Sequence, residues 1–311
     1  MPLPSQVHQD SALENVSIAY KNGDLVAQRL APMVNVRHES DTYYVYSRDQ
    51  LTLPETARAN GAEANKSDFS LSTAAYQCVE HALKSVITDR SRSNADPALN
   101  LEVDATENLT NHILVRQEVE LARILAASGA WANVTSLTST FAWSANTTLS
   151  NPLLFVDSAA SIVAQSSGMV PNVGFINDPT FRAAKEHTSI VDRIKYTSAE
   201  SVGEALLAKL FGVDELLVGR GIFNTGAEGL ADATTNSWIW TDMAWFGYVE
   251  KNPGLRKPSA LYNFVVKAGN PVKVLRWRED ALEGDAIQVS KMFQIVAPMS
   301  AAGYQIWNTI Q

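Results

Sequence analysis

The sequence DATENLTNHILVRQEVELARILAASG, residues 104–129, decides the fold because it predicts one long helix. Asp104 and Glu107 have the spacing of a capping box, and Gly129 is a helix stop. At ~1.5 Å per residue such a helix is about 39 Å long. Its apolar residues form two stripes, Leu114, Leu121 and Leu125 on one side and Leu109 and Ile113 on the other. We therefore expect the helix to be wedged between layers rather than to lie on a surface.

Two segments of different character precede this helix. Residues 1–40 contain short apolar groups broken by Asn22-Gly23 and Pro32, which indicates an arm that needs another surface to lie on. DTYYVYSRD (41–49) and FSLSTAAYQCVEHALKSVI (69–87) have the composition and alternation of two strands. Together they predict a long β-hairpin.

The segment between these two strands, LPETARANGAEANKS (53–67), is almost free of large apolar residues, and we call it the hairpin tip. It cannot bury a core of its own, and loops of this length in compact domains are usually functional or disordered. We expect the tip to become ordered on a neighbouring subunit; the alternative is a floppy surface loop.

The rest of the chain mixes helices and strands. Helices are predicted from Asn151-Pro152 to Gly168, from Asp178-Pro179 to about His187, and over 201–211. NVGFIN (172–177) and ELLVGRGIF (215–223) are predicted strands, and the final third is rich in strands. The fold class is therefore α+β.

Composition excludes several classes of protein. A chain of 311 residues that is 46% hydrophobic can bury a sizeable core in one or two domains. The net charge of -8, without a basic block, is not that of a protein that grips nucleic acid phosphates. A signal peptide and apolar runs of about 18 residues are absent, so we expect a soluble, cytosolic chain without a membrane partner. Cys78 is the single cysteine and is expected to be buried.

A search for catalytic and ligand-binding motifs finds little. Gly219 and Gly221 begin a dinucleotide fingerprint, but Asn224 replaces its third glycine, so we expect these glycines only to mark a strand that leaves its sheet. The histidines and Cys78 lack metal-ligand spacing, and no nucleophile motif occurs. Acidic residues such as Asp280 and Asp285 are expected to be solvated turn residues. We predict no enzyme activity, no cofactor and no metal.

The order of these parts resembles a known family, the major capsid proteins of tailed bacteriophages with the Hong Kong 97 fold. The stretches that carry the resemblance are NVSIAYKNGDLVAQRLAPMVNV (15–36), YQCVEHALKSVITDRSRSNADPALNLEVDATENL (76–109) and LLAKLFGVDELLVGRGIFN (206–224). It covers essentially the whole chain.

The resemblance implies a division of the chain into four parts. Residues 1–40 would be the N-terminal arm and 41–80 the extended loop. Residues 81–150, with the spine helix at 104–129, would form the peripheral domain together with 270–311. Residues 151–269 would form the axial domain.

The resemblance to this family also implies a function. The chain would assemble with itself through pentamers and hexamers into an icosahedral shell that encloses double-stranded DNA without reading its sequence. Scaffolding, portal and decoration proteins would be its partners. The chain would assemble in the host cytoplasm and reside in the virion.

The residues expected at intersubunit contacts lie in the hairpin tip: Leu53, Pro54, Glu55, Arg58, Glu63 and Lys66. Some members of the family cross-link a loop lysine to an asparagine, but no asparagine partner for Lys66 can be matched. Two other functions stay open at this point. One is an encapsulin-type compartment, which uses the same fold, and the other is an α/β enzyme with an unrecognised site.

Overall fold

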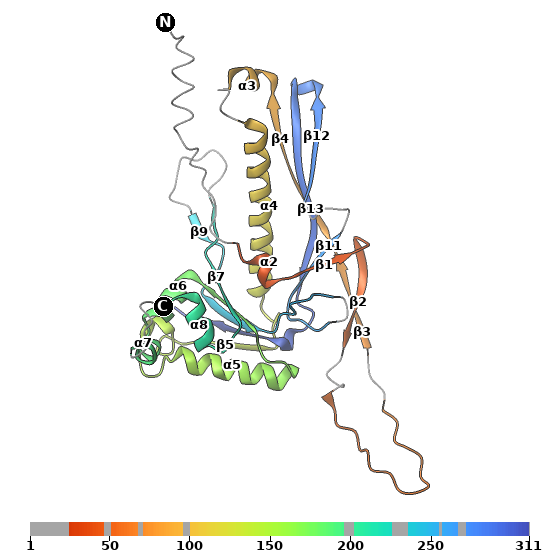
Figure 1. Ribbon diagram of the computed structural model, residues 1–311, viewed down its shortest axis with the longest axis vertical. Coiled ribbons are helices and arrows are strands. Elements are labelled where there is room, and N and C mark those ends of the chain that lie inside the picture. Colours follow the sequence, from red (N-terminus) through yellow and green to blue (C-terminus); the bar gives the residue numbers. More distant parts are fainter. Residues whose placement is uncertain are drawn as a thin grey trace.

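Two five-stranded sheets and one long helix organise the chain (Figure 1). The computed structural model describes residues 25–46, 51–67, 71–95, 100–195, 202–225, 236–254, 257–266 and 272–310. Residues 1–24 of the predicted arm lie outside the described residues. The mixture of helices and sheets confirms the α+β class.

The long helix, α4, spans Leu101–Leu125. It begins before Asp104 because Asn100 caps it, with a side chain that accepts a backbone N–H bond from the first turn at 3.4 Å. It also ends before Gly129, which adopts a φ of +81° in the turn that follows. The predicted helix is present, with both ends shifted toward the N-terminus.

Strand β13 (Gly284–Val296) is the centre of the first sheet, which runs beside α4. On one side it pairs antiparallel with β4, and on the other with β12 and then β11. Strand β1 adds a parallel edge next to β11. The bounds are β1 Met33–Val36, β4 Val79–Thr88, β11 Tyr262–Val266 and β12 Lys273–Glu279.

The first half of α4 packs on this sheet. Leu109 and Ile113 are buried with Ile87 of β4 and with Ile287 and Val289 of β13. Alternate residues of β13 therefore face the helix, as the period of two in a strand requires.

The second half of α4 enters a larger core that links the two sheets. Leu121 and Leu125 are fully buried there, with Phe175 and Trp245 of the second sheet and Val265 of the first. The helix is thus wedged between layers as predicted. Leu114, expected in the same stripe, is only partly buried.

The second sheet has the order β5-β14-β10-β6-β7. Its strands are β5 Asn133–Ser136, β6 Val173–Asn177, β7 Glu215–Gly219, β10 Met243–Gly247 and β14 Gly303–Trp307. Strands β5 and β14 belong to this sheet by hydrogen bonding, although the resemblance grouped both with the peripheral domain. Likewise β11 pairs with β13 of the first sheet. The division into domains stays a prediction.

Four helices share a core with the second sheet: α5 Pro152–Ser167, α6 Asp178–Glu186, α7 Thr188–Ile194 and α8 Glu204–Leu210. Asn151 caps α5 by accepting the Leu153 N–H at 3.1 Å, and Pro152 stands at the first helical position. The sequence signals for α5, α6 and α8 are therefore correct to within a few residues, whereas α7 has no predicted counterpart.

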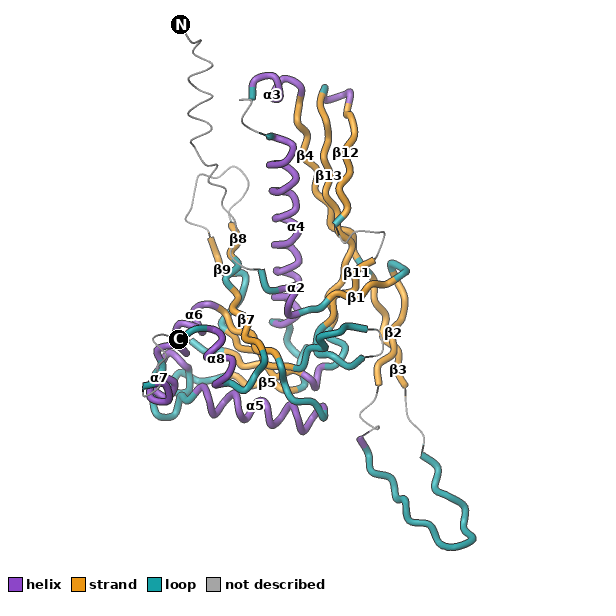
Figure 2. The backbone as a smooth tube through the Cα atoms, viewed as in Figure 1, coloured by secondary structure: helices purple, strands orange, loops and turns teal. Residues whose placement is uncertain are grey.

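The segment before the first sheet crosses α4. Helix α2 (Ala27–Leu30) packs on α4, and the chain then enters β1 (Figure 2). The side chains of Val26, Ala27 and Leu30 are buried in the core that contains Leu121 and Leu125. The described part of the predicted arm thus lies on its own subunit.

Gly219 and Gly221 have a packing role where β7 leaves the second sheet. A Cβ on Gly219 would lie 2.5 Å from Cδ1 of Trp240 and 2.8 Å from Cζ of Phe175. The strand continues into the short ribbon of β8 (Ile222–Asn224) and β9 (Asn236–Trp238). Gly219 lets the Trp240 ring approach the backbone, and Gly221 does the same for Ile239, whose Cδ1 would lie 2.9 Å from an added Cβ.

We expect Gly219→Ala to lower the free energy of unfolding by about 1–3 kcal/mol, because the added methyl overpacks the Trp240 and Phe175 rings. Gly254→Ala is the matched control, since among the described residues its added Cβ would meet only the Lys257 side chain at 3.9 Å. Its effect should stay within about 0.5 kcal/mol. Urea unfolding of the two variants measures both; equal effects would contradict the packing role.

Candidate assembly surfaces

The hairpin tip is the most exposed part of the described chain. Strands β2 (Ser40–Tyr46) and β3 (Leu71–Gln77) pair antiparallel, and the tip extends beyond them, away from both sheets (Figure 1). Every tip residue is exposed, and the Leu53 side chain is 92% accessible. A single exposed apolar side chain is common on protein surfaces, so the exposure of Leu53 does not by itself identify a contact.

The six residues predicted at intersubunit contacts all lie on this tip: Leu53, Pro54, Glu55, Arg58, Glu63 and Lys66. The contacts recorded inside the tip are local. The Glu55 carboxylate accepts the Ala57 N–H at 2.9 Å, and the Asn65 side chain donates to the Glu55 carbonyl at 2.9 Å. The structure brings the six residues together on one loop and leaves their role as contacts a prediction.

The base of the hairpin is anchored, in contrast to its tip. The rings of Tyr43 and Tyr76 lie 5.4 and 4.9 Å from the ring of Phe264 on β11. The Tyr76 hydroxyl donates to the His38 carbonyl at 3.3 Å. Cys78, at the end of β3, is buried as predicted, and burial raises the pKa of its thiol to about 11. A rigid base therefore carries a projecting loop.

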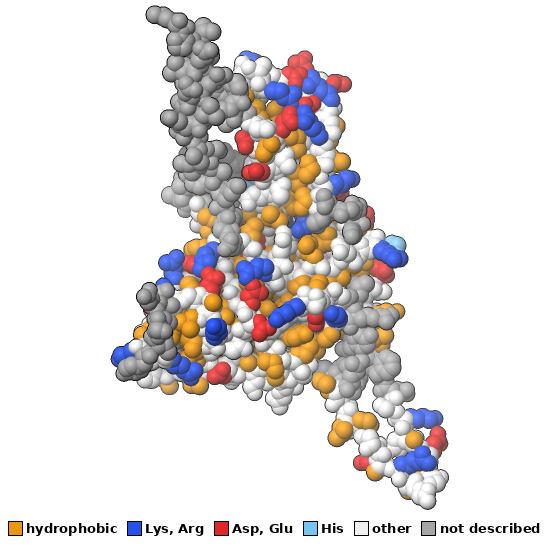
Figure 3. All heavy atoms as spheres, in the orientation of Figure 1, with side chains coloured by type: hydrophobic (Ala, Val, Ile, Leu, Met, Phe, Trp, Pro, Cys, Tyr) orange, Lys and Arg blue, Asp and Glu red, His pale blue; other side chains and the backbone are white. Residues whose placement is uncertain are grey.

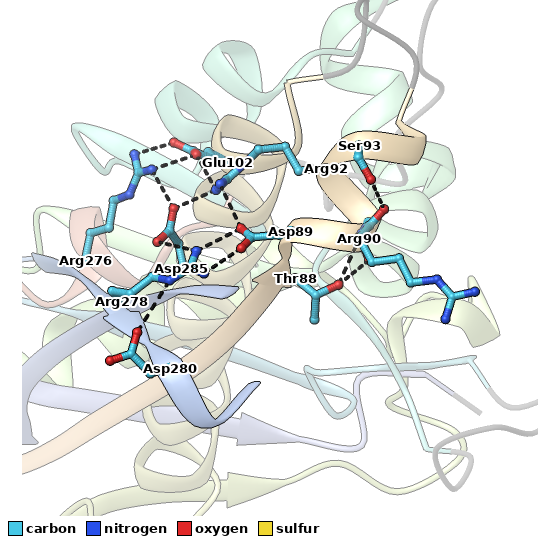
Figure 4. Close-up of polar contacts among 11 residues, drawn as sticks. Thr88, Asp89, Arg90, Arg92, Ser93, Glu102, Arg276, Arg278, Asp280 and Asp285 are labelled. Carbon is cyan, nitrogen blue, oxygen red and sulfur yellow. Dashed lines mark hydrogen bonds and ion pairs between the residues drawn. The ribbon is translucent and has the colours of Figure 1, made fainter. Parts of the chain in front are cut away.

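A cluster of ion pairs fixes the other end of the molecule, where α3 (Asp89–Asn94) meets the β12–β13 turn (Figure 4). Asp285 accepts bonds from Arg92 at 2.7 Å and Arg276 at 3.0 Å. Arg276 also binds Glu102 of α4. We call this group, with Asp89 and Arg278, the distal cluster.

Asp89 and Arg278 complete the cluster with two bonds between guanidinium and carboxylate, at 2.8 and 2.5 Å. The bond from Arg278 holds the pKa of Asp89 below its usual range, and the bonds from Arg92 and Arg276 do the same for Asp285. The expectation that Asp285 is a solvated turn residue is wrong: its side chain is only 16% exposed. Arg276 lies across the β12–β13 turn, but Arg92 is distant in sequence, so no local pattern reveals it.

Charged and apolar side chains are distributed unevenly over the visible face. Figure 3 shows acidic and basic groups gathered at the distal end. On the sheet face turned away from α4, Leu275 and Trp277 of β12 are exposed, and the Lys84 ammonium lies 6.0 Å from the centre of the Trp277 ring. These residues form a mixed surface of the kind found at protein interfaces.

The arrangement of Ser150 and His187 resembles a nucleophile and its base, but the imidazole donates to the hydroxyl instead of accepting from it. The Ser189 N–H donates to Nδ1 of His187 at 3.2 Å, so the proton of the neutral ring lies on Nε2. Nε2 then donates to the Ser150 hydroxyl at 3.0 Å and cannot accept its proton. Both side chains are buried, and burial lowers the pKa of His187. The pair joins α7 to the loop before α5.

Metal sites and membrane spans are two further features that a functional surface can carry. Among the residues that the structure describes, no three His, Cys, Asp or Glu side chains are grouped to hold a metal ion. None of the helices in the described ranges combines the length and apolar character needed to cross a membrane.

Comparison with known proteins gives consistent results. No family model matches the chain. It is 25% identical over 304 residues to the major capsid protein of Burkholderia phage BcepMu, covering 96% of this chain and 95% of the relative. It is 27% identical over 234 residues to the major capsid protein of Pseudomonas phage JBD67, covering 74% of each.

Solved structures show the same fold. A phage-related protein from Bordetella bronchiseptica has a TM-score of 0.73 at 23% identity, covering 98% of this chain and 97% of that one. The capsid structure of cyanophage P-SCSP1u has a TM-score of 0.67 at 10% identity, covering 94% of this chain and 90% of that one. The SrpI encapsulin of Synechococcus elongatus has a TM-score of 0.61 at 11% identity, covering 99% of this chain and 96% of that one. The fold is that of capsid proteins, and with the two sequence relatives it defines a structural capsid shell protein.

The buried His187 predicts a pH dependence of stability. In the unfolded chain its ring takes up a proton near pH 6.5, whereas the folded ring has a lowered pKa. The unfolded state therefore binds more protons, and stability should fall as the pH drops below about 6.5. His187→Gln should reduce this slope in urea titrations, and His112→Gln, at an exposed position, should leave it unchanged. The same slope in all three proteins would contradict the assignment.

The distal cluster predicts a dependence on acid and salt. Because the folded pKa of Asp285 is lowered, its contribution to stability is present above about pH 3.9 and is lost as the pH falls through the folded pKa. Asp285→Asn should lower the melting temperature at pH 7, and less so in 1 M salt, which screens ion pairs. Asp280→Asn is the control, since that side chain is 96% exposed with one contact at 3.7 Å. An effect of Asp285→Asn that is independent of salt would contradict an ionic role.

Proposed function

We propose that this chain is the major capsid protein of a tailed bacteriophage and that it has the Hong Kong 97 fold. It assembles through pentamers and hexamers into an icosahedral shell around double-stranded DNA. The observation that carries the proposal is the similarity to the BcepMu capsid protein over 304 residues, nearly the full length of both chains. The exposed hairpin tip supports it, because a projecting loop without a core suits a contact with a neighbouring subunit.

The parts of the subunit have separate roles in this proposal. Residues 1–40 are the arm and 41–80 the extended loop. The first sheet and α4 belong to the peripheral domain, 81–150 with 270–311, and residues 151–269 form the axial domain. Strand pairing favours adding β5 and β14 to the axial part and β11 to the peripheral part.

The net charge of the chain suits the proposed contents of the shell. A net charge of -8 suits a shell that holds DNA by enclosure rather than by phosphate contacts. Scaffolding, portal and decoration proteins are the expected partners, and assembly takes place in the host cytoplasm. The role is structural, without catalysis, cofactor or metal.

An encapsulin-type compartment is the second candidate, because the fold also matches an encapsulin. The two sequence relatives favour the phage capsid. A terminase or portal gene next to this gene would support the phage capsid. An adjacent gene for a cargo enzyme would support the encapsulin-type compartment.

Electron microscopy of the purified protein, expressed alone and with its neighbouring genes, tests the proposal. We expect rings of five and six subunits and closed shells. A monodisperse monomer at high concentration under both conditions would count against a capsid function.

The hairpin tip can be tested separately by replacing Leu53 to Lys66 with a Gly-Ser linker. The subunit should keep its circular-dichroism spectrum and cooperative melting, because the tip adds nothing to either core. Shell yield and heat resistance should fall sharply, because the same contact recurs at every subunit. Shells as heat-resistant as the original would support the alternative of a floppy surface loop.

A further inference from the structure

The ribbon of β8 and β9 projects from the second sheet with little support of its own. Its two strands, Ile222–Asn224 and Asn236–Trp238, pair only with each other among the described strands. All six residues are exposed, including two large aromatic side chains, Phe223 at 37% and Trp238 at 46%. A ribbon of two strands is only marginally stable in water unless something packs on it.

Neither aromatic side chain of the ribbon belongs to a core of the subunit. The buried clusters contain the next two residues along the chain, Ile239 and Trp240, but not Phe223 or Trp238. Aromatic residues are enriched at protein interfaces, and tryptophan is prominent among the residues that dominate binding energy. The ribbon therefore has the composition of a contact surface.

The β2–β3 hairpin exposes a second surface of similar character. Tyr43 and Tyr76 face Phe264, so the residues that alternate with them along the two strands face away from it. We call this second surface the outer hairpin face: Thr42, Tyr44, Leu71, Thr73 and Ala75. All five residues are exposed, Tyr44 at 56% and Leu71 at 42%.

The ribbon and the outer hairpin face match in charge. Neither surface contains a charged side chain, although Asp, Glu, Lys and Arg make up 19% of the chain. Contact between the two surfaces desolvates no ionised group, and desolvation of charge is the main cost of burying a surface. Burial of their aromatic and aliphatic groups is favourable.

The two surfaces are separated within one subunit. The ribbon lies on one side of α4 and the hairpin lies on the other (Figure 2). In a ring built from head-to-tail contacts, one side of each subunit meets the opposite side of the next. A ring of subunits therefore brings together surfaces that a single subunit keeps apart.

We propose that the ribbon is the docking surface for the outer hairpin face of the next copy of this chain, with Phe223 and Trp238 as its anchors. The inference rests on the proposed assembly into rings of five and six subunits, and it names the surfaces that meet in the ring. The contact involves the paired strands at the base of the hairpin and is separate from the hairpin tip.

Photo-crosslinking in assembled shells tests this contact directly. A chain with p-benzoylphenylalanine in place of Trp238 is co-assembled with an isotope-labelled chain of unaltered sequence. Crosslinks should join the ribbon to labelled peptides that contain residues 40–46 or 71–77, and the label shows that two copies are joined. The same photoreactive residue in place of Trp277, an exposed position on the first sheet, is the control and should give no such crosslink.

The crosslinking result overturns the proposal in either of two cases. In the first, crosslinks from position 238 stay within one copy or reach only other segments of the second copy. In the second, position 277 reaches the hairpin strands as efficiently as position 238.

Substitution separates assembly from folding. Trp238→Ser and Tyr44→Ser should keep the circular-dichroism spectrum and melting temperature of the unassembled subunit, because neither side chain lies in a described core. Each should lower the yield of shells at least about tenfold, because loss of an aromatic anchor weakens the contact at every subunit. Trp238→Phe keeps an aromatic side chain and is the matched control, which should restore most of the yield.

The double variant, with Trp238→Ser and Tyr44→Ser, should assemble no worse than the poorer single variant, because both changes remove the same contact. Shells formed at normal yield by Trp238→Ser would overturn the inference and leave the capsid assignment intact. Failure of the unaltered chain to assemble would contradict the capsid assignment itself, and the inference with it.

Discussion

The packing of α4 against both sheets is the constraint on which the rest of the structure depends. Its first half lies on β4 and β13 through Leu109 and Ile113, and its second half enters the core shared with the second sheet through Leu121 and Leu125. One helix therefore packs against two sheets that have none of the described strands in common. Removing the first face would uncover β4 and β13, and removing the second would open the core between the two sheets.

Polar contacts add to this apolar frame where it would otherwise be weakest. The distal cluster ties α3 and the start of α4 to the β12–β13 turn, beyond the reach of the main core. Exposed ion pairs are individually weak, but here three arginines share three carboxylates, those of Asp89, Glu102 and Asp285, as a network. Glu118 performs a different task in the middle of the helix, because its bonds reach backbone groups of another segment.

The fold could be predicted from the sequence wherever the signal is local. The presence of α4 and its apolar stripes, the Asn151-Pro152 start of α5 and the alternation in β2 and β3 are set by neighbouring residues, whereas the ends of α4 differ from the prediction. Polar contacts between distant segments are harder to predict from the sequence. Arg92, Arg276 and Asp285 meet only after β4, β12 and β13 have paired, and a glutamate at position 118 in a helix has no local sign of burial. The pairing of β14 with β5 and β10 also depends on long-range order.

Contacts within a single subunit do not explain how the hairpin tip is held in place. It is exposed throughout, and its recorded contacts are local, although its base is fixed on Phe264. The most direct measurement is amide hydrogen exchange of residues 53–67 in unassembled subunits and in assembled shells. Our account predicts fast exchange in the subunit and strong protection in the shell, with α4 protected in both. Equal, fast exchange of the tip in both states would contradict the claim that neighbouring subunits order it.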